Sequence, residues 1–335
     1  MTTEPTLKWQ DPTWIEEAHA WIRQQANQHG IPITGEIEQP HIYPWSTVMK
    51  IPTDQGLIFF KATAQETVYE STLTQKLAEY YPKCMPKLIS VETSLGWMLM
   101  RDGGEPLRAS IRPTKNIQPW YPVIQLFSEV QIGCIKHTPE LINMNIPDWR
   151  LVNLPRFYTE LLADTDSILV DQPKGLTSEE FNRAQGLTPR FAQICKQLMS
   201  IGIPETVNHG DFHDGNVLVK DGNIILFDWG DACVAHPFIS LRTFFVSIEI
   251  ALELDDYSFT PEMQALLNVY LEPWQKFAPK ERLQEAYLLS RCVASIVKAL
   301  MWHQTISSIK YPLRDEYAHI VPELFREFIE YEKRL

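Results

Sequence analysis

Short apolar runs, each bounded by turn residues, mark the first 100 residues of the chain. Residues 46–51, 57–61, 87–91 and 97–100 carry the β-branched, aromatic and other apolar side chains expected of strands. They surround one segment, residues 65–81, in which apolar side chains recur at helical spacing. This part of the chain is therefore predicted to form an antiparallel sheet with one helix.

Beyond Arg101 the apolar positions recur mainly at helical spacing. The predicted helices are 120–136, 154–163, 178–199, 238–254, 261–277, 281–303 and 322–333. One pair of short apolar runs, 217–219 and 224–227, interrupts them, and Asp221-Gly222 between the runs is typical of a tight hairpin turn. A β-rich N-terminal lobe over residues 1–100 is thus followed by a mainly helical lobe over residues 101–335, and the predicted fold class is α+β.

Composition narrows the class of protein. With 335 residues, of which 44% are hydrophobic and 21% charged, the chain resembles an ordinary globular protein large enough for two lobes. Its net charge of −12, without any long basic patch, argues against a nucleic-acid partner. No apolar stretch approaches the ~20 residues that cross a bilayer, and neither end resembles a leader segment. We therefore expect no membrane partner and a cytoplasmic location.

The cysteines do not form a recognisable site. The five are scattered without a CxxC pair, so neither a disulfide framework nor a zinc site is indicated. We expect them to be buried as small apolar side chains.

Oxygen-bearing side chains gather in the stretch HGDFHDGN, residues 209–216. The predicted hairpin that follows ends at another carboxylate, Asp228, and returns it beside this loop. Mg²⁺ prefers one or two carboxylates together with phosphate oxygens and water. If Asn216 and Asp228 hold the metal, Asp211 is left to accept a proton from an attacking hydroxyl.

The spacing from Asp211 to Asn216 is that of the protein-kinase catalytic loop, and Asp228-Trp229-Gly230 stands where kinases have Asp-Phe-Gly. Two alternatives compete with this interpretation. Aspartates beside glycine are often simple turn formers. Residues 210–214 also match the GDxxD element of binuclear metal-dependent phosphoesterases, but the chain contains neither the DxH upstream nor the GNH downstream that such enzymes add.

A lysine in an apolar run is the second unusual feature. Lys61 ends the run GLIFFK, where an ammonium group needs a partner. In the next predicted helix, Glu70 lies in line with the apolar positions Leu73 and Leu77 and is the expected partner. The alternatives are Glu66 as the partner, or a solvated Lys61 at a strand edge.

Together these motifs resemble the aminoglycoside phosphotransferase and choline kinase family, whose members share a protein-kinase-like fold and phosphorylate small molecules. The resemblance rests on FFKA with Glu70, on GWMLMRDGG at the expected hinge, on HGDFHDGN and on FDWGDACVAHPF. It implies a bilobal kinase-like fold with a nucleotide-binding N-lobe. By this resemblance the site residues are Asp211 as the catalytic aspartate, Asn216 and Asp228 as magnesium ligands, Lys61 as the phosphate-binding lysine, Glu70 as its orienter, and Met98 to Arg101, with Met98 and Met100 as nucleotide contacts, beside the adenine.

Two departures from protein kinases affect the prediction. Residues 41–50 contain no glycine, so we expect a loop built on Trp45, Ser46 and Thr47 to cover the phosphates through backbone and hydroxyl donors. No APE segment follows Gly230, which points away from a protein substrate.

Four further polar residues lie near these motifs. His209 is expected to tie the loop together. His213 and Asp214 either brace the loop or face the acceptor, and Asp231 either assists the metal or caps the next helix.

The sequence therefore predicts a phosphotransferase that uses Mg²⁺ with ATP or GTP and moves the γ-phosphoryl group to a hydroxyl of a small molecule. The acidic residues Glu249, Glu253, Asp255 and Asp256, on or just after the helix that follows the active-site loop, either are solvated surface or line the acceptor cleft. In the second case they would attract a cationic acceptor, an aminoglycoside- or choline-like amine. The alternatives are a noncatalytic nucleotide-binding protein and the metal-dependent phosphoesterase.

Overall fold

The computed structural model describes residues 7–255, 258–309 and 313–335. Within these residues the chain forms two compact units. The first comprises the described residues of 1–106, 216–230 and 309–313, and the second comprises 107–215, the described residues of 231–308, and 314–335. Each unit is described by itself.

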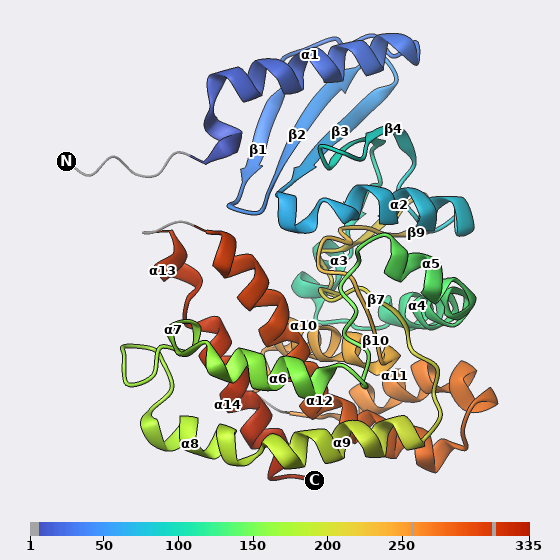
Figure 1. Ribbon diagram of the computed structural model, residues 1–335. Coiled ribbons are helices and arrows are strands. Elements are labelled where there is room, and N and C mark those ends of the chain that lie inside the picture. The colour runs from blue at the N-terminus through green and yellow to red at the C-terminus, as the bar shows by residue number, and fades with distance from the viewer. Residues whose placement is uncertain (1–6, 256–257, 310–312) are drawn as a thin grey trace. The chain divides into compact units, whose positions relative to one another are not determined.

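A five-stranded antiparallel sheet forms most of the first unit (Figure 1). Its strand order is β1-β2-β3-β5-β4, which places β2, β3 and β5 inside the sheet with partners on both sides. The strands are β1 (Glu38–Ile42), β2 (Ser46–Thr53), β3 (Gly56–Thr63), β4 (Leu88–Glu92) and β5 (Trp97–Arg101). The predicted strands correspond to β2, β3, β4 and β5, and the predicted helix corresponds to a 3₁₀ turn at Gln65–Thr67 followed by α2 (Tyr69–Tyr80).

A second helix in this unit was not predicted. Helix α1 (Pro12–Gln28) begins after Asp11, whose carboxylate accepts hydrogen bonds from the backbone N–H groups of Thr13 and Trp14. Its buried residues Trp14, Ala18, Ile22 and Ala26 are four apart, so they form one apolar stripe. The stripe joins the core that the sheet contributes, where Trp14 meets the edge of Trp97 at 6.1 Å between ring centroids. The prediction of a single helix in this region was therefore wrong.

The predicted hairpin is present and belongs to the first unit. Strands β8 (Val217–Lys220) and β9 (Asn223–Leu226) pair in antiparallel register, and β6 (Glu105–Pro106) extends the sheet on the side of β8. Asp221 and Gly222 both have positive φ, 51° and 76°. This is the conformation that a two-residue type I′ hairpin turn requires.

The second unit is mainly helical, as predicted. It also holds a small antiparallel pair, β7 (Thr206–Asn208) with β10 (Cys233–Ala235). Its helices are α3 (Arg108–Thr114), α4 (Trp120–Cys134), α5 (Thr138–Asn143), α6 (Leu154–Ala163), α7 (Thr165–Ile168), α8 (Ser178–Gly186), α9 (Thr188–Ser200), α10 (Leu241–Leu252), α11 (Pro261–Leu271), α12 (Lys280–Ser308), α13 (Arg314–Tyr317) and α14 (Ile320–Glu332).

One of the predicted helices is divided into two helices in the structure. The continuous helix expected over 178–199 is interrupted at Leu187, between α8 and α9. Pro189 explains the break, because proline lacks an N–H donor and clashes with the preceding turn, and it is tolerated only in the first turn of a new helix.

All five cysteines are buried and free, as expected. Among the described helices, none combines the length and the apolar character needed to span a bilayer.

Candidate active site

The loop that carries Asp211 runs between β7 and β8 and is anchored to the second unit by an aromatic side chain. Phe212 is fully buried and stacks on Phe127 of α4, with ring centroids 4.0 Å apart, and on Phe244 of α10, with centroids 5.8 Å apart. Before the loop, Asn208 accepts hydrogen bonds at its side-chain oxygen from the Ser240 hydroxyl and backbone N–H. The loop is therefore held at its entrance and at its centre.

Gly210 allows the loop to pass close to neighbouring backbone. Its φ is +75°, and a Cβ at this position would lie 2.0 Å from the backbone oxygen of Asp231. Both the left-handed conformation and the close approach require glycine.

We therefore expect Gly210→Ala to destabilise the protein by at least about 3 kcal/mol, as measured by urea unfolding. Gly202→Ala is the matched control, because Gly202 has a similar φ of +83° but a Cβ added there would have no neighbouring atom within 4 Å. The control should lose only the ~1–2 kcal/mol of a left-handed alanine. Equal losses in the two variants would show that the close approach to Asp231 has no energetic importance.

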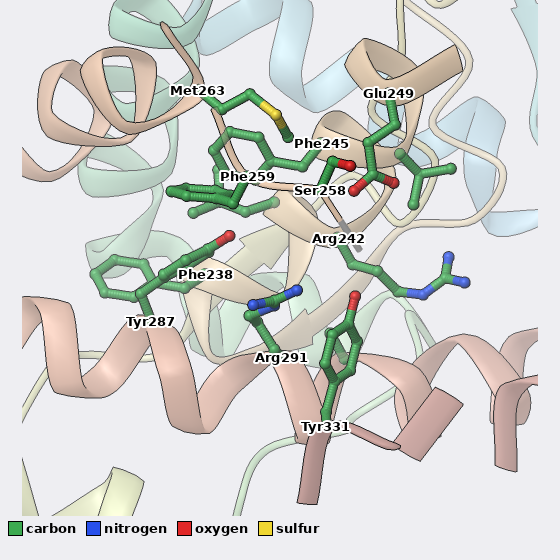
Figure 2. Close-up of a pocket in the computed structure, with 13 residues that line it drawn as sticks. Phe238, Arg242, Phe245, Glu249, Ser258, Phe259, Met263, Tyr287, Arg291 and Tyr331 are labelled. Carbon is green, nitrogen blue, oxygen red and sulfur yellow. The ribbon is translucent and has the colours of Figure 1, made fainter. Parts of the chain in front are cut away.

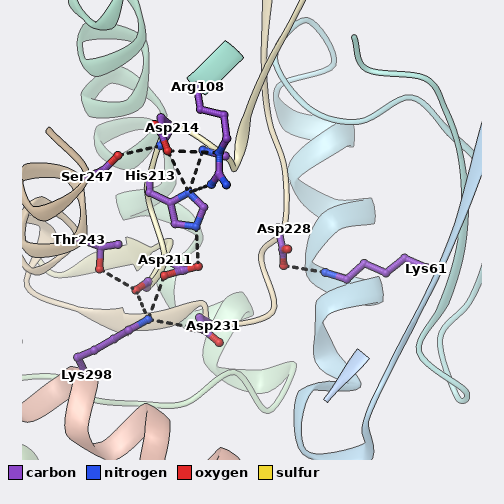
Figure 3. A network of polar contacts seen from close by, with 12 residues as sticks. Lys61, Arg108, Asp211, His213, Asp214, Asp228, Asp231, Thr243, Ser247 and Lys298 are labelled. Atoms are coloured by element: carbon purple, nitrogen blue, oxygen red, sulfur yellow. Dashed lines mark hydrogen bonds and ion pairs between the residues drawn. The ribbon is translucent and has the colours of Figure 1, made fainter. Parts of the chain in front are cut away.

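Asp211 is held through both of its carboxylate oxygens (Figure 3). Oδ1 lies 3.2 Å from Nζ of Lys298, and Oδ2 lies 3.1 Å from Nε2 of His213. Burial tends to raise the pKa of Asp211, but Lys298, His213 and His209 outweigh it and hold the pKa well below its usual range. The group is thus a carboxylate with a fixed orientation, and about a third of its side chain is exposed.

His213 and Asp214 hold the loop through hydrogen bonds, which is the first of the two roles that the sequence left open. Nδ1 of His213 accepts from the Gly215 backbone N–H at 2.9 Å and from the guanidinium of Arg108 at 3.1 Å, so the ring proton resides on Nε2 and faces Asp211. Asp214 is fully buried and accepts two hydrogen bonds from Arg112, at 2.7 and 3.0 Å. Neither Arg108 nor Arg112 was anticipated from the sequence.

Lys298 of α12 is a third residue of the site that the sequence analysis missed. Its Nζ reaches the carbonyl oxygen of Gly210 and the carboxylates of Asp211 and Asp231. The sequence does contain a signal for Lys298, because this lysine lies inside the mainly apolar stretch 292–301. Lys61 was noticed for the same reason, since it ends an apolar run. Asp231 does not cap the next helix, because His236 provides the cap by accepting from the Phe238 N–H.

In the first unit, Lys61 of β3 lies between two carboxylates. Its Nζ is 2.6 Å from Glu70 Oε1 and 2.7 Å from Asp228 Oδ1, and the residue is only 5% exposed. Burial lowers the pKa of Lys61, but Asp228 and Glu70 outweigh burial, so the pKa is raised and the ammonium stays charged. The predicted pairing with Glu70 is present.

The hairpin register places the backbone of Asn216 opposite Phe227, the residue before Asp228. Val217 of β8 pairs with Leu226 of β9, and the backbone N–H of Phe227 donates to the carbonyl of Asn216. Asp228 follows directly, with φ +65° and 41% of its side chain exposed. One amide and one carboxylate oxygen fit a Mg²⁺ ion that takes its remaining ligands from phosphate and water.

The remaining predicted nucleotide contacts lie in the sheet. Ser46 begins β2 and closes the β1–β2 turn through two backbone hydrogen bonds with Tyr43. Thr47 is fully buried, and its hydroxyl donates to the His41 carbonyl and accepts from the Gln39 side chain. That hydroxyl is engaged inside the hairpin, which leaves Ser46 as the hydroxyl candidate.

The two methionines lie in β5, which pairs with β3 and β4. Met98 is 1% exposed and belongs to the core, whereas Met100 is partly exposed. Of these two methionines, only Met100 therefore has exposed side-chain atoms.

A small cavity in the second unit bears on the acidic residues noted in the sequence (Figure 2). Its volume is about 20 Å³, room for one water molecule. Glu249 lines it together with Arg242 and Arg291. Of the other acidic residues, Glu253 is exposed and lies 2.5 Å from Lys115, Asp255 is exposed, and Asp256 lies outside the described residues.

Comparisons with known proteins support the kinase-like interpretation. The model of the "phosphotransferase enzyme family" matches residues 148–245, a range that includes the loop and the hairpin described above. No curated protein sequence matches the chain.

Solved structures resemble the chain over nearly its whole length at low sequence identity. An ethanolamine kinase from Plasmodium vivax has a TM-score of 0.63 at 13% identity, with 94% of this chain and 89% of that chain covered. A choline kinase from Streptococcus pneumoniae has a TM-score of 0.61 at 10% identity, with 94% and 99% covered. An amicoumacin kinase in complex with AMP-PNP, Ca²⁺ and Ami has a TM-score of 0.57 at 10% identity, with 94% of this chain and 96% of that chain covered.

The predicted resemblance and the predicted kinase-like fold are both confirmed. Residues 148–245 thus match a phosphotransferase family model, and the solved structures show that the fold of the chain is kinase-like.

Proposed function

We propose that the protein transfers the γ-phosphoryl group of ATP or GTP, bound with Mg²⁺, to a hydroxyl group of a small molecule. The observation that carries the proposal is the buried Lys61, whose ammonium lies between Glu70 and Asp228. Burying a charged lysine to 5% exposure destabilises the fold unless oppositely charged groups compensate for the lost hydration. Phosphate binding is a task that fits a compact, permanently charged ammonium.

Each polar residue has a distinct role in the proposed reaction. Lys61 binds phosphate oxygens, and Glu70 fixes its direction. Asn216 and Asp228 would hold Mg²⁺, which when bound neutralises charge on the phosphates. Among the predicted nucleotide contacts, Ser46 and Met100 remain available to the nucleotide.

Asp211 orients the acceptor hydroxyl. The acceptor oxygen forms a bond to the γ-phosphorus, the bond to the β,γ-bridging oxygen breaks, and the nucleoside diphosphate leaves with that oxygen. The hydroxyl proton passes to Asp211. Because the pKa of Asp211 is held below its usual range, this carboxylate positions the hydroxyl first and accepts the proton only as the new bond forms.

The acceptor is proposed to be a cationic alcohol. The ethanolamine and choline kinases of similar fold are named for alcohols that carry an amine or ammonium group. Within the described residues, however, Glu249 shares its cavity with two arginines, so this cavity does not select cations by charge alone. The cationic preference therefore rests on the fold resemblance and on the acidic composition.

The phosphoesterase alternative finds less support. Among the described residues no three His, Cys, Asp or Glu side chains are grouped so that they could share a metal ion. A binuclear hydrolase needs more ligands than one amide and one carboxylate. Binding of a nucleotide that requires Mg²⁺ would distinguish the kinase from this alternative.

The role of Lys61 gives the first functional prediction. Lys61→Met should raise the nucleotide KM by about tenfold or more and lower kcat, because a charge-assisted contact to phosphate is lost. It should also lower the Tm, since Glu70 is 1% exposed and loses a buried partner, a change that costs about 3 kcal/mol.

The double variant Lys61→Met/Glu70→Gln separates the two effects. It should recover part of the Tm but none of the nucleotide affinity. Lys50→Met, on the neighbouring strand β2 and 38% exposed, is the matched control and should leave both unchanged. Normal nucleotide affinity in Lys61→Met would contradict the proposed function.

A further inference from the structure

Lys298 is a buried lysine on a helix that contributes no motif to the sequence analysis. It lies in α12, is 8% exposed, and belongs to a stretch whose other members are buried core residues. A lysine in such a place is rare unless it is paired. The reason for its presence must therefore be found among its contacts.

The contacts use every donor that the ammonium has. The three partners of Nζ are the Gly210 carbonyl oxygen at 3.1 Å, Asp211 Oδ1 at 3.2 Å and Asp231 Oδ2 at 2.9 Å. An ammonium has three N–H groups and no more. Lys298 thus has no donor left for a phosphate or an acceptor, which excludes a direct substrate contact in this arrangement.

Lys298 instead helps to hold the carboxylate of Asp211 in one orientation. His213 holds the other oxygen of Asp211, and Arg108 together with the Gly215 N–H fixes the His213 ring. With one donor on each oxygen, the carboxylate cannot rotate without losing a hydrogen bond. Lys298 also forms an ion pair with Asp231, the residue that follows Gly230, as Figure 3 shows.

We propose that Lys298 is a positioning residue that fixes the orientation of the Asp211 carboxylate for the acceptor hydroxyl. This inference rests on the proposed function, because it assigns Lys298 a task only if Asp211 is the residue that meets the hydroxyl. Orientation matters strongly in such a reaction, since a small misplacement of a catalytic group costs about 100-fold in rate. The charged groups around Asp211 and Lys298 are His209, His213, Asp231 and Arg242.

The test compares variants of Lys298 in steady-state kinetics. Lys298→Met removes the charge and keeps the length of the side chain, and it should lower kcat by about 10- to 100-fold. The nucleotide KM should change by less than about threefold, because Lys298 contacts no nucleotide-binding residue. Lys298→Arg restores the charge and should recover part of kcat. Lys280→Met is the matched control, because Lys280 is exposed at the first turn of the same helix.

A double-mutant cycle with Asp211→Asn separates positioning from a merely structural role. If Lys298 acts through Asp211, adding Lys298→Met to Asp211→Asn should lower kcat by no more than about twofold. Independent multiplication of the two losses, or an unchanged kcat in Lys298→Met, would overturn the inference while leaving the proposed function intact.

The variant also needs a check on its fold. If Lys298→Met melts too early to be assayed, Lys298→Met/Asp231→Asn removes one of the two carboxylates that lose their partner. The inference predicts that this double variant regains Tm and still has a reduced kcat. A wild-type kcat in the folded double variant would overturn it.

Discussion

Asp211→Asn is expected to lower kcat by a factor of about 100 or more while nucleotide binding stays within about threefold of wild type. The substitution removes the proposed proton acceptor and loses one hydrogen bond, because the amide nitrogen cannot accept from Lys298 or His213. Steady-state kinetics with a verified acceptor and nucleotide titration by calorimetry measure the two quantities separately.

The control for this prediction is Asp221→Asn. Asp221 lies in the hairpin turn at a φ of 51°, which asparagine tolerates, and it is exposed. Normal turnover in Asp211→Asn, or an equal loss in both variants, would exclude Asp211 as the catalytic residue.

Asp228→Asn is expected to weaken nucleotide binding in the presence of Mg²⁺ by about tenfold or more and to lower kcat as strongly as Asp211→Asn. The variant loses the proposed charged metal ligand, which is also one of the two carboxylates that hold Lys61. Asparagine is the better substitution here because Asp228 has a φ of +65°, a conformation that asparagine adopts far more readily than alanine.

Calorimetric titration with and without Mg²⁺ checks this prediction. The expected difference is specific: the variant should bind free nucleotide almost as wild type does, and Mg²⁺ should improve its affinity far less. Asp228→Ala should show the same loss of metal dependence with a lower Tm. If Mg²⁺ strengthens nucleotide binding equally in Asp228→Asn and wild type, Asp228 is not a metal ligand.

Local sequence signals located much of the candidate site. The Asp221-Gly222 turn could be predicted because both residues tolerate positive φ, and the turn fixes the register that places Asn216 opposite Phe227, the residue before Asp228. The pairing of Lys61 with Glu70 followed from helical periodicity, because only one face of α2 can turn toward the sheet. In each case one local rule sufficed.

The residues that escaped prediction depend on contacts between distant parts of the chain. Lys298 lies 87 residues from Asp211 in the sequence, and nothing in the motif of residues 209–216 indicates which helix will pack against this loop. The Thr47 hydroxyl was expected to face phosphate, yet the β1–β2 register directs it at the His41 carbonyl. Helix α1 differs, because its Asp11 cap and the spacing of four between its apolar residues are local signals in the sequence.

The most direct test of the proposed function follows a labelled γ-phosphoryl group. The protein, Mg²⁺ and γ-¹⁸O-labelled ATP or GTP would be incubated with small alcohols that carry positive, neutral or negative charge, and the products would be identified by mass spectrometry. We predict that wild-type protein adds labelled phosphoryl to at least one alcohol, that cationic alcohols react best, and that Asp211→Asn forms at least about 100-fold less product. Label found only in inorganic phosphate, at the same rate with and without acceptors and in both proteins, would contradict the assignment as a small-molecule kinase.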